Sequence, residues 1–323
     1  MGKHARWTTP DLLGTDILCL MADSIHILAP AKINLALTVG PPGPDRMHPI
    51  ASWMVTIDLM DEIEITRRDT PPMSLYAVAW HEDALRKPDI DWPMSTDLAA
   101  RAHQALERHV GRELPVRLKV EKRIPPGSGL GGGSADAAAV LRGVNELFEL
   151  GLTDTELARI GADIGSDVPF QVHGGSAVVE GLGDRIESHE HLPEIDAVLI
   201  LPDEQCSTAE VYGWFDDLAE ERGEKKMRSE EVKKCAAAPI TPDTPFNDLA
   251  EPALRSSPGL EAIIKAVSEL AERPTHVTGS GAGLFVVCDE AFHAEALAEA
   301  IRERLKLPAI AIRSCGNGSV QRT

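Results

Sequence analysis

The chain has 323 residues, of which 43% are hydrophobic and 26% are charged, so it has room for one large or two ordinary domains with a packed core. Its net charge of −19 argues against a nucleic-acid backbone or an anionic membrane as the main partner. The five cysteines are scattered and never spaced CxxC, which fits a cytoplasmic location and predicts neither a zinc site nor a disulfide framework.

The first segment is short and partly apolar. Leu12, Leu13 and residues 17–21 are apolar, but Asp11 and Asp16 interrupt the run, which is too short for a membrane-spanning helix. We therefore expect no signal peptide, a loose extension over residues 1–24 and a natural start at Met21.

The next segments alternate between strand and helix patterns. Apolar residues recur with period two over residues 27–39 and 53–65, which predicts two strands with one buried face. Residues 96–109 are predicted to be helical, and the alternation over 116–124 predicts a strand that leads into a glycine-rich loop. Behind that loop, apolar residues at helical spacing predict a helix over 134–149.

A capping box at residues 153–156 begins a further predicted helix, which Gly165 ends. Because Pro169 disfavours helical geometry at Val168, we place Asp167 on a loop just beyond that helix.

The second half of the chain repeats this mixture. Residues 197–201 are predicted to form a strand, and we place a domain boundary near residue 190, giving domains of residues 25–190 and 191–323. Residues 260–270 form an amphipathic helix, and two predicted strands flank a second glycine loop.

The first glycine loop reads PPGSGLGGGSADAAAV from Pro125 to Val140. Such a run is either a flexible turn or a phosphate cradle; here it follows a strand and opens a helix, where unpaired amide N–H groups favour an anion. It lacks the Lys-Ser or Lys-Thr of a P-loop and also departs from the dinucleotide pattern. The sequence therefore predicts a phosphate site whose cation comes from elsewhere in the chain.

The second glycine loop, Thr278 to Gly283, is explained equally well by a hairpin bend and by a ligand contact. Two separate glycine loops, each joined to regular structure, favour one shared nucleotide site.

Several polar positions stand out, and two of them, Lys32 and Asp167, have two interpretations each. Side chains alternate between the two faces of a strand, so Lys32 and Asn34 lie on the same face, opposite the apolar residues. That face is turned toward either solvent or a cleft. Asp167 is either a surface carboxylate that accepts backbone hydrogen bonds or a group that orients a hydroxyl proton. By residue type alone, His48 is interpreted as a loop histidine and residues 189–191 as a solvated linker.

Taken together, several segments resemble the motifs of the galactokinase, homoserine kinase, mevalonate kinase and phosphomevalonate kinase (GHMP) superfamily. Within it, the sequence is most similar to the 4-diphosphocytidyl-2-C-methyl-D-erythritol kinase family of the non-mevalonate isoprenoid pathway. The resemblance covers nearly the whole chain and rests on Pro30–Leu35, Pro125–Ala139, Gly165–Phe170, Ser207–Tyr212, Phe246–Leu249 and Thr278–Gly283.

The resemblance implies an α+β fold of two domains, the first similar to the second domain of ribosomal protein S5 and the second ferredoxin-like. ATP and Mg²⁺ are expected at the first glycine loop, and a small-molecule acceptor in the cleft between the domains. The implied nucleotide-binding residues are Pro125, Gly127, Ser128, Gly129, Leu130, Gly131, Gly132, Gly133, Ser134 and Ala135. The implied acceptor-binding residues are Asn34, Met47, His48, Thr208, Tyr212, Gly279, Ser280 and Gly281.

The resemblance also supplies the missing cation, since it assigns that role to Lys32. Asp167 is expected to take or orient the proton of the acceptor hydroxyl, and Ser134 is a candidate Mg²⁺ ligand. The implied activity is ATP-dependent phosphorylation of the 2-hydroxyl of the cytidylylated methylerythritol.

One position departs from the family, because Met47 stands where the family usually has a tyrosine that stacks on cytosine. Tyr212 matches the opposite wall, and His48 the residue whose backbone reads the base. A thioether can still pack on a ring.

A homoserine or mevalonate type of kinase, which needs no cytidine site, stays open as an alternative. A non-catalytic nucleotide sensor is the other alternative, although it would need neither Lys32 nor Asp167. The sequence leaves the oligomeric state open.

Overall fold

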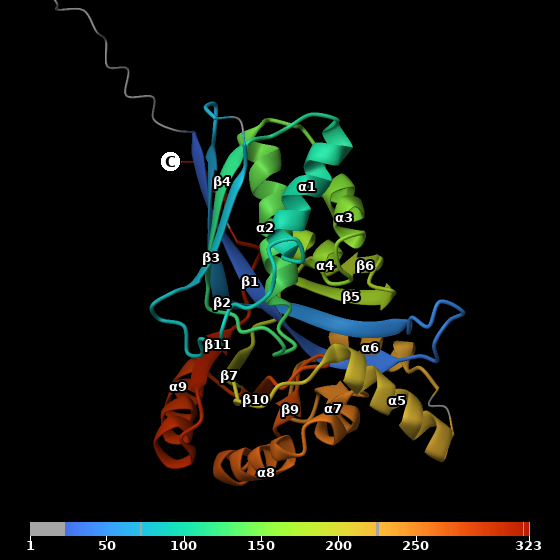
Figure 1. Cartoon of the computed structure of the whole chain (residues 1–323). Coiled ribbons are helices and arrows are strands. Elements are labelled where there is room, and N and C mark those ends of the chain that lie inside the picture. The colour runs from blue at the N-terminus through green and yellow to red at the C-terminus, as the bar shows by residue number, and fades with distance from the viewer. Residues whose placement is uncertain (1–22, 72, 224–225, 319, 323) are drawn as a thin grey trace, which may run out of the picture.

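The structure is a computed structural model that describes residues 23–71, 73–223, 226–318 and 320–322. These residues form two β-sheets, each with helices packed against it (Figure 1). The start expected at Met21 lies outside the described residues, as does most of the extension expected over residues 1–24.

The first sheet follows the order β12-β1-β2-β4-β3, with β5 paired to β2, β6 to β5 and β8 to β1. Its strands are β1 (Ser24–Val39), β2 (Ile50–Arg67), β3 (Leu75–Trp80), β4 (Val116–Lys122), β5 (Ser176–Gly181), β6 (Arg185–Ser188), β8 (Phe246–Asn247) and β12 (Val320–Arg322).

The long antiparallel pair β1 and β2 is irregular around the segment that carries Lys32. The register shifts between Pro30 and Ala31 and again between Asn34 and Ala36. Register irregularities of this kind bend a strand and change the direction of its side chains. Lys32 and Asn34 lie between the two shifts. Both side chains are buried, so they do not face solvent, which was one of the two possibilities that the sequence left open.

Four helices lie on one face of the first sheet (Figure 1). They are α1 (Leu98–Val110), α2 (Gly132–Leu147), α3 (Asp154–Ala162) and α4 (Val168–His173). The capping box predicted for α3 is confirmed: the Thr153 side chain accepts from the Glu156 amide, while Glu156 accepts from the Thr153 amide.

The prediction for the segment around Asp167 is wrong at one residue, Val168. Val168 is helical and begins α4, with Pro169 in the first turn, while α3 already ends at Ala162. Proline is tolerated there because the first N–H groups of a helix have no intrahelical partner. Asp167 is thus the residue that precedes a helix.

The second sheet has the order β11-β7-β10-β9 and is antiparallel throughout. Its strands are β7 (Asp196–Ile200), β9 (His276–Val277), β10 (Leu284–Cys288) and β11 (Ala309–Arg313). The helices of this half are α5 (Thr208–Arg222), α6 (Ser229–Ala236), α7 (Ala250–Ser256), α8 (Gly259–Ala271) and α9 (Ala291–Ala300), followed by a π-helical turn, η1 (Ile301–Leu305). The predicted α+β class is confirmed.

The chain passes from the first sheet to the second between β6 and β7, near the boundary predicted at residue 190. However, β8 and β12 lie later in the chain and pair with β1. The division into residues 25–190 and 191–323 therefore stays a prediction.

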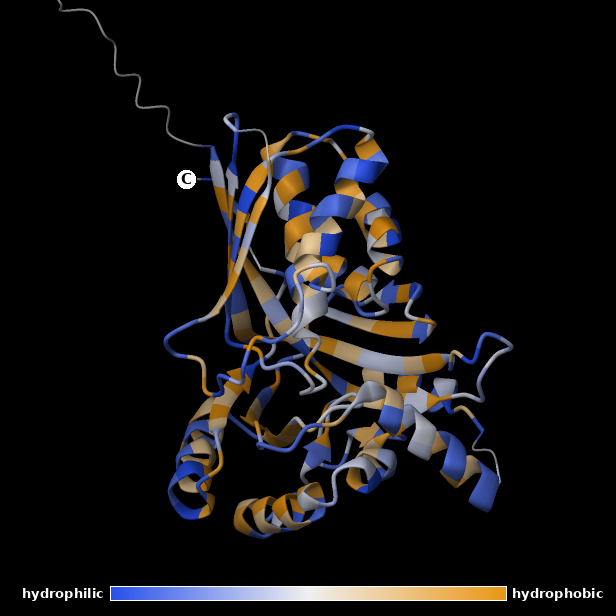
Figure 2. Cartoon of the chain, viewed as in Figure 1, coloured by the Kyte–Doolittle hydropathy of each residue, from blue (hydrophilic) through white to orange (hydrophobic). Residues whose placement is uncertain are grey.

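Buried apolar side chains join the two halves. Ile33 and Trp53 of the first sheet share one cluster with Leu199 and Phe285 of the second. Figure 2 shows hydrophobic residues along the strands of both sheets and alternating orange and blue bands on the helices, as amphipathic helices require. Among the described residues, no helix combines the length and the apolar character that crossing a membrane would need.

Candidate active site

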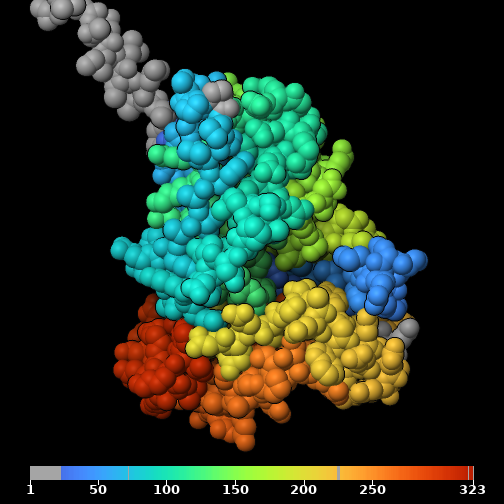
Figure 3. Space-filling view, in the orientation of Figure 1, coloured from blue at the N-terminus to red at the C-terminus, as the bar shows by residue number. Residues whose placement is uncertain are grey.

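A cavity of about 510 Å³ lies where the two halves meet. Both glycine loops line it, together with Lys32, Asn34 and Asp167 from the first half and Thr208 and Tyr212 from the second. In the space-filling view a hollow opens between the upper part of the molecule and the yellow segment that contains α5 (Figure 3). The structure thus brings into one cavity most of the residues that the sequence singled out.

The first glycine loop runs from the end of β4 to the start of α2 with Gly127, Gly129 and Gly131 in left-handed geometry, at φ of 69°, 73° and 69°. Gly131 precedes α2, and no described side chain caps that helix end. The first amide N–H groups of α2 therefore keep their hydrogen-bonding capacity for a ligand. The helix dipole adds positive potential at the same place, so the loop suits a phosphate.

The two glycine loops are fastened to each other. The Gly283 amide donates to the Ser128 carbonyl at 3.0 Å, and the Ala282 amide to the Gly127 carbonyl at 3.3 Å. A Cβ atom added at Gly281 would collide with the backbone of Gly129. The second loop is therefore both a hairpin bend between β9 and β10 and part of the cavity wall, so its two interpretations are compatible.

Lys32 brings an ammonium group to the first glycine loop. Its side chain is buried, and its Nζ donates to Asn34 Oδ1 at 2.8 Å and to the Gly129 carbonyl at 2.9 Å. The same Nζ lies 3.5 Å from Asp167 Oδ2. One ammonium group thus connects the first glycine loop with the carboxylate, and its position is fixed by groups from three segments of the chain.

Asn34 holds Lys32 from a rigid position. Its Nδ2 donates to Ser52 Oγ at 2.8 Å, and its backbone amide donates to Thr278 Oγ1 at 3.0 Å, beside the second glycine loop. Asn247 fastens that loop from the other side, donating to the carbonyls of Val277 at 2.9 Å and Gly279 at 2.7 Å. These contacts give the second glycine loop a fixed distance from Lys32.

Asp167 keeps its carboxylate available. It precedes α4, yet its side chain makes no capping hydrogen bond to that helix, and the side chain is 26% exposed. Burial, together with the nearby charge of Asp167, raises the pKa of Tyr212 to about 12. Tyr212 therefore stays protonated near neutral pH, close to the carboxylate.

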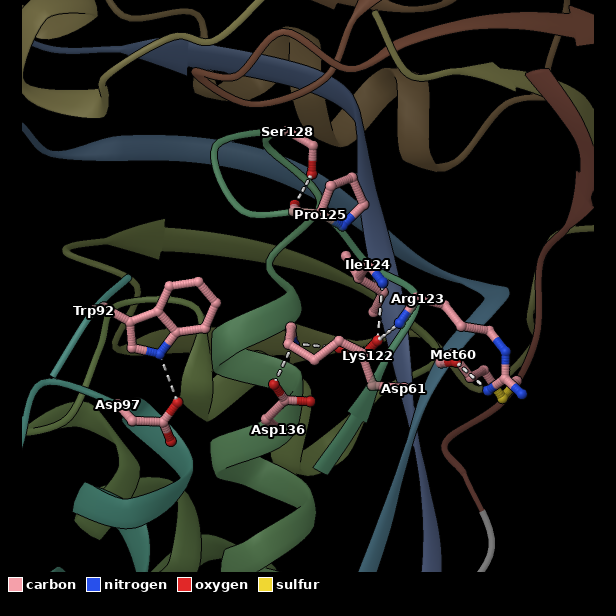
Figure 4. A network of polar contacts seen from close by, with 10 residues as sticks. All are labelled: Met60, Asp61, Trp92, Asp97, Lys122, Arg123, Ile124, Pro125, Ser128 and Asp136. Atoms are coloured by element: carbon pink, nitrogen blue, oxygen red, sulfur yellow. Dashed lines mark hydrogen bonds and ion pairs between the residues drawn. The ribbon is translucent and has the colours of Figure 1, made fainter. Parts of the chain in front are cut away.

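A second lysine in the cavity wall is already neutralised. Lys122 Nζ lies 2.5 Å from Asp61 Oδ2 and 2.5 Å from Asp136 Oδ2, and all three side chains are buried (Figure 4). Burial alone would lower the pKa of Lys122, but the two carboxylates raise it above its ordinary value. Among the described residues of the cavity wall, Lys32 is therefore the cation left for a phosphate.

The acceptor-binding residues expected at the other end of the cavity divide into two groups. Thr208 and Tyr212 line it, and Thr208 Oγ1 lies 3.0 Å from Ser280 Oγ. Met47 and His48 lie outside the lining: Met47 is 52% exposed, while the His48 imidazole packs 5.0 Å from the ring of Tyr212. Ala135 is buried and also lies outside the lining, whereas the other expected nucleotide-binding residues belong to it.

Comparison with known proteins identifies the family. The model of the GHMP kinases N terminal domain matches residues 97–175, and that of GHMP kinases C terminal matches residues 225–307. A 4-diphosphocytidyl-2-C-methyl-D-erythritol kinase of Exiguobacterium sibiricum is 34% identical over 279 residues, which are 86% of this chain and 94% of that protein. The chain belongs to the 4-diphosphocytidyl-2-C-methyl-D-erythritol kinase family.

A kinase of the same name from Citrifermentans bemidjiense is 44% identical over 188 residues, which are 58% of this chain. That match spans 64% of the relative's length, just under two thirds. A solved structure of a 4-(cytidine 5′-diphospho)-2C-methyl-D-erythritol kinase superposes with a TM-score of 0.70 at 28% identity, covering 90% of this chain and 100% of that one. The two-domain GHMP fold predicted from the motifs is confirmed.

GHMP kinases use ATP as the phosphate donor, and the donor set of this cavity fits Mg²⁺, the ion that the resemblance to the family implies. Mg²⁺ prefers one or two carboxylates or hydroxyls and takes its remaining ligands from phosphates and water. Asp167 and Ser134 both line the cavity. No cluster of three or more His, Cys, Asp or Glu side chains able to hold a metal occurs among the described residues, so the phosphates would have to complete the coordination.

Sequence reasoning missed two parts of this cavity wall. The loop before α1 contributes Trp92, whose indole Nε1 donates to Asp97 Oδ2 at 3.0 Å, and both residues line the cavity (Figure 4). The Lys122 cluster is the other part. Asp136 gave a usable signal, because a carboxylate inside an alanine-rich helix face requires a buried partner. Trp92 gave none, since it lies in an irregular segment.

Proposed function

We propose that this member of the family is an ATP-dependent kinase that phosphorylates the 2-hydroxyl of 4-diphosphocytidyl-2-C-methyl-D-erythritol, in non-mevalonate isoprenoid biosynthesis. The observation that carries the proposal is the placement of Lys32 between the first glycine loop and Asp167 within one cavity. The printed names of the relatives support the choice of acceptor.

The phosphates of ATP would be held by the amide N–H groups that begin α2 and by Lys32. Bound Mg²⁺ would neutralise phosphate charge, with Ser134 as its candidate protein ligand. Phosphoryl transfer depends mostly on positioning and charge stabilisation, so the backbone cradle and one fixed ammonium suffice without a P-loop lysine.

Asp167 would accept or orient the proton of the acceptor hydroxyl. Its carboxylate is part-exposed in the cavity and uncommitted to helix capping, as a general base must be. Lys32, whose Nζ lies 3.5 Å from that carboxylate, would polarise the hydroxyl.

The acceptor would occupy the end of the cavity lined by Thr208, Tyr212 and the second glycine loop, with Asn34 at its base. An aromatic face offers a planar base a stacking surface, and Tyr212 is the aromatic residue there. His48 and Met47 would complete the site from the loop between β1 and β2. We also propose a cytoplasmic location, from the scattered cysteines, and no nucleic-acid partner, from the net charge of −19.

One observation favours a second candidate. Met47 is half-exposed and lies outside the cavity lining, which leaves Tyr212 as the one aromatic wall at this end among the described lining residues. A homoserine or mevalonate type of acceptor would need no second wall.

The experiment that tests the proposal is product identification. The purified protein is incubated with ATP, Mg²⁺ and the cytidine acceptor, and the products are followed by ³¹P NMR. We expect ADP and an acceptor phosphorylated at the 2-hydroxyl in equal amounts, and no ADP with an analogue that lacks this hydroxyl. ATP binding without ADP formation would instead support a nucleotide sensor.

A further inference from the structure

Three residues at successive turns of α5 lie on one side of the helix, and two of them line the cavity. Thr208, Tyr212 and Asp216 follow one another at a spacing of four residues, which places them on the same side of a helix. Thr208 and Tyr212 line the cavity, but Asp216 does not. Its Oδ1 instead contacts His48 Nε2 at 2.8 Å, across the junction between the two halves of the molecule.

The His48 imidazole is enclosed by this helix. Its side chain is 6% exposed, and its ring centroid lies 5.0 Å from that of Tyr212 and 5.8 Å from that of Phe215. The Asp216 carboxylate is 41% exposed and accepts from the imidazole, so it fixes the ring orientation. Four residues of two domains thus form one packed unit.

This unit determines where Tyr212 can lie. The rings of His48 and Tyr212 are already in contact, tilted by 41°, so no planar group fits between them. A planar base bound in the cavity would therefore have to stack on the part of Tyr212 that lines the cavity. The His48 imidazole would then support the Tyr212 ring from the other side. Met47, the residue that departs from the family, lies outside the lining and gives no such support.

We propose that Asp216 is a positioning residue: through the His48 imidazole it holds Tyr212 in place and so sets the affinity for the nucleobase of the acceptor. The inference rests on the proposed function, because it requires an acceptor that carries a planar base. Asp216 itself touches neither the cavity nor the reacting groups.

The test compares Asp216→Ala with Asp217→Ala. Asp217 is the next residue of α5 and is exposed, so both variants remove one negative charge from the same helix turn. For Asp216→Ala we expect the KM for the cytidine acceptor to rise about tenfold, corresponding to the loss of one charge-assisted contact, while the KM for ATP and kcat change less than twofold. Asp217→Ala should leave all three constants at their wild-type values.

Two further variants separate positioning from folding. Asp216→Asn retains an oxygen that accepts from His48, so it should restore the acceptor KM to within about threefold of the wild-type value. Combined with Asp216→Ala, His48→Gln should add little, since both changes interrupt the same support. Thermal melting of every variant identifies one that has merely unfolded.

The outcomes are distinct. Equal acceptor KM values for Asp216→Ala and Asp217→Ala would overturn the positioning role while leaving the kinase intact. A parallel rise in both KM values, with a lower melting temperature that Asp216→Asn does not restore, would show a structural role only. Wild-type protein that fails to turn over the cytidine acceptor would remove the proposed function itself, and with it this inference.

Discussion

Lys32 Nζ lies 3.5 Å from Asp167 Oδ2 and 2.9 Å from the carbonyl oxygen of Gly129, so one buried ammonium joins a strand, a helix start and a glycine loop. Lys32 comes from an irregular part of β1, and Asp167 from the residue before α4. Because the ammonium is fixed by Asn34, it need not reorganise when a phosphate and a hydroxyl approach.

Replacing Asp167 by Asn should lower kcat by about 10²–10⁴-fold, since the amide cannot accept the hydroxyl proton. ATP affinity, measured by calorimetry, should stay within a few fold. Asp163→Asn, at the exposed end of α3, is the matched control and should behave as wild type. Turnover unchanged in Asp167→Asn would exclude this carboxylate from the chemistry.

Met47→Tyr restores the aromatic residue that the family usually has in the loop between β1 and β2. Since Met47 is half-exposed and outside the cavity lining, a larger ring fits without repacking, and acceptor affinity should be preserved or tightened. Calorimetric titration with cytidine 5′-diphosphate measures it. A large loss of affinity would mean that this wall of the site is built differently.

Gly281→Ala should separate the two glycine loops, because its Cβ would meet the backbone of Gly129 rather than a movable side chain. We expect a loss of about 2–4 kcal/mol in the free energy of unfolding, and a higher KM for ATP. Gly213→Ala is the control: it lies within α5, nothing surrounds its Cβ within 4 Å, and it should stabilise by about 0.5–1 kcal/mol. Equal stability of the two variants would contradict the tight approach.

Lys122→Met should destabilise the protein by about 3–5 kcal/mol in urea unfolding, since it leaves the carboxylates of Asp61 and Asp136 buried without their cation. Burial and the neighbouring carboxylate of Asp61 already raise the pKa of Asp136 against the pull of Lys122. Lys119→Met, on the same strand but 44% exposed, should change stability by less than about 1 kcal/mol. A similar small effect for Lys122→Met would show that the cluster carries no structural role.

The free energy of unfolding should depend on pH through His103. Burial lowers its pKa from the ordinary value of 6.5, against the opposing effects of the Leu114 carbonyl and Glu107. Its Nε2 donates to that carbonyl at 2.7 Å, and its Nδ1 lies 2.9 Å from the Tyr76 hydroxyl, which a neutral ring satisfies. As pH falls below 6.5, the unfolded chain takes up the proton before the folded protein does.

The stability that the neutral ring contributes is therefore present above pH 6.5 and is lost below it, by at most about 1.4 kcal/mol per pH unit. Urea unfolding between pH 5 and 8 should show a shallower slope for His103→Gln than for wild type. The exposed His191→Gln should retain the wild-type slope. Identical slopes for wild type and His103→Gln would exclude His103 as the group responsible.

Local patterns predicted much of this fold. Period-two alternation placed the long strands β1 and β2, and the glycine run placed the start of α2, observed at Gly132 rather than residue 134. The family motifs predicted that Lys32 lies at the first glycine loop, as observed. The alternation of side chains along the strand could not decide whether Lys32 faces solvent or a cleft. Proline statistics misplaced Val168, because a first-turn proline and a loop proline look alike in sequence.

What the sequence could not predict depends on contacts between distant segments. Asp61, Lys122 and Asp136 lie on two strands and a helix, and only the packing of α2 on the sheet brings them together. The contact between His48 and Asp216 crosses the junction of the two halves and has no local signal. Side-chain direction in the turn at Met47 is set by its backbone, which neither residue type nor motif reveals.

The most direct test of the central claim is ATP consumption by the purified protein with Mg²⁺, measured separately with 4-diphosphocytidyl-2-C-methyl-D-erythritol, homoserine, mevalonate and phosphomevalonate. We predict ADP formation with the cytidine compound alone. Turnover with one of the other three acceptors instead would retain Lys32 and Asp167 as the catalytic pair but contradict the acceptor, and ATP binding without ADP formation in any of the four would contradict the kinase itself.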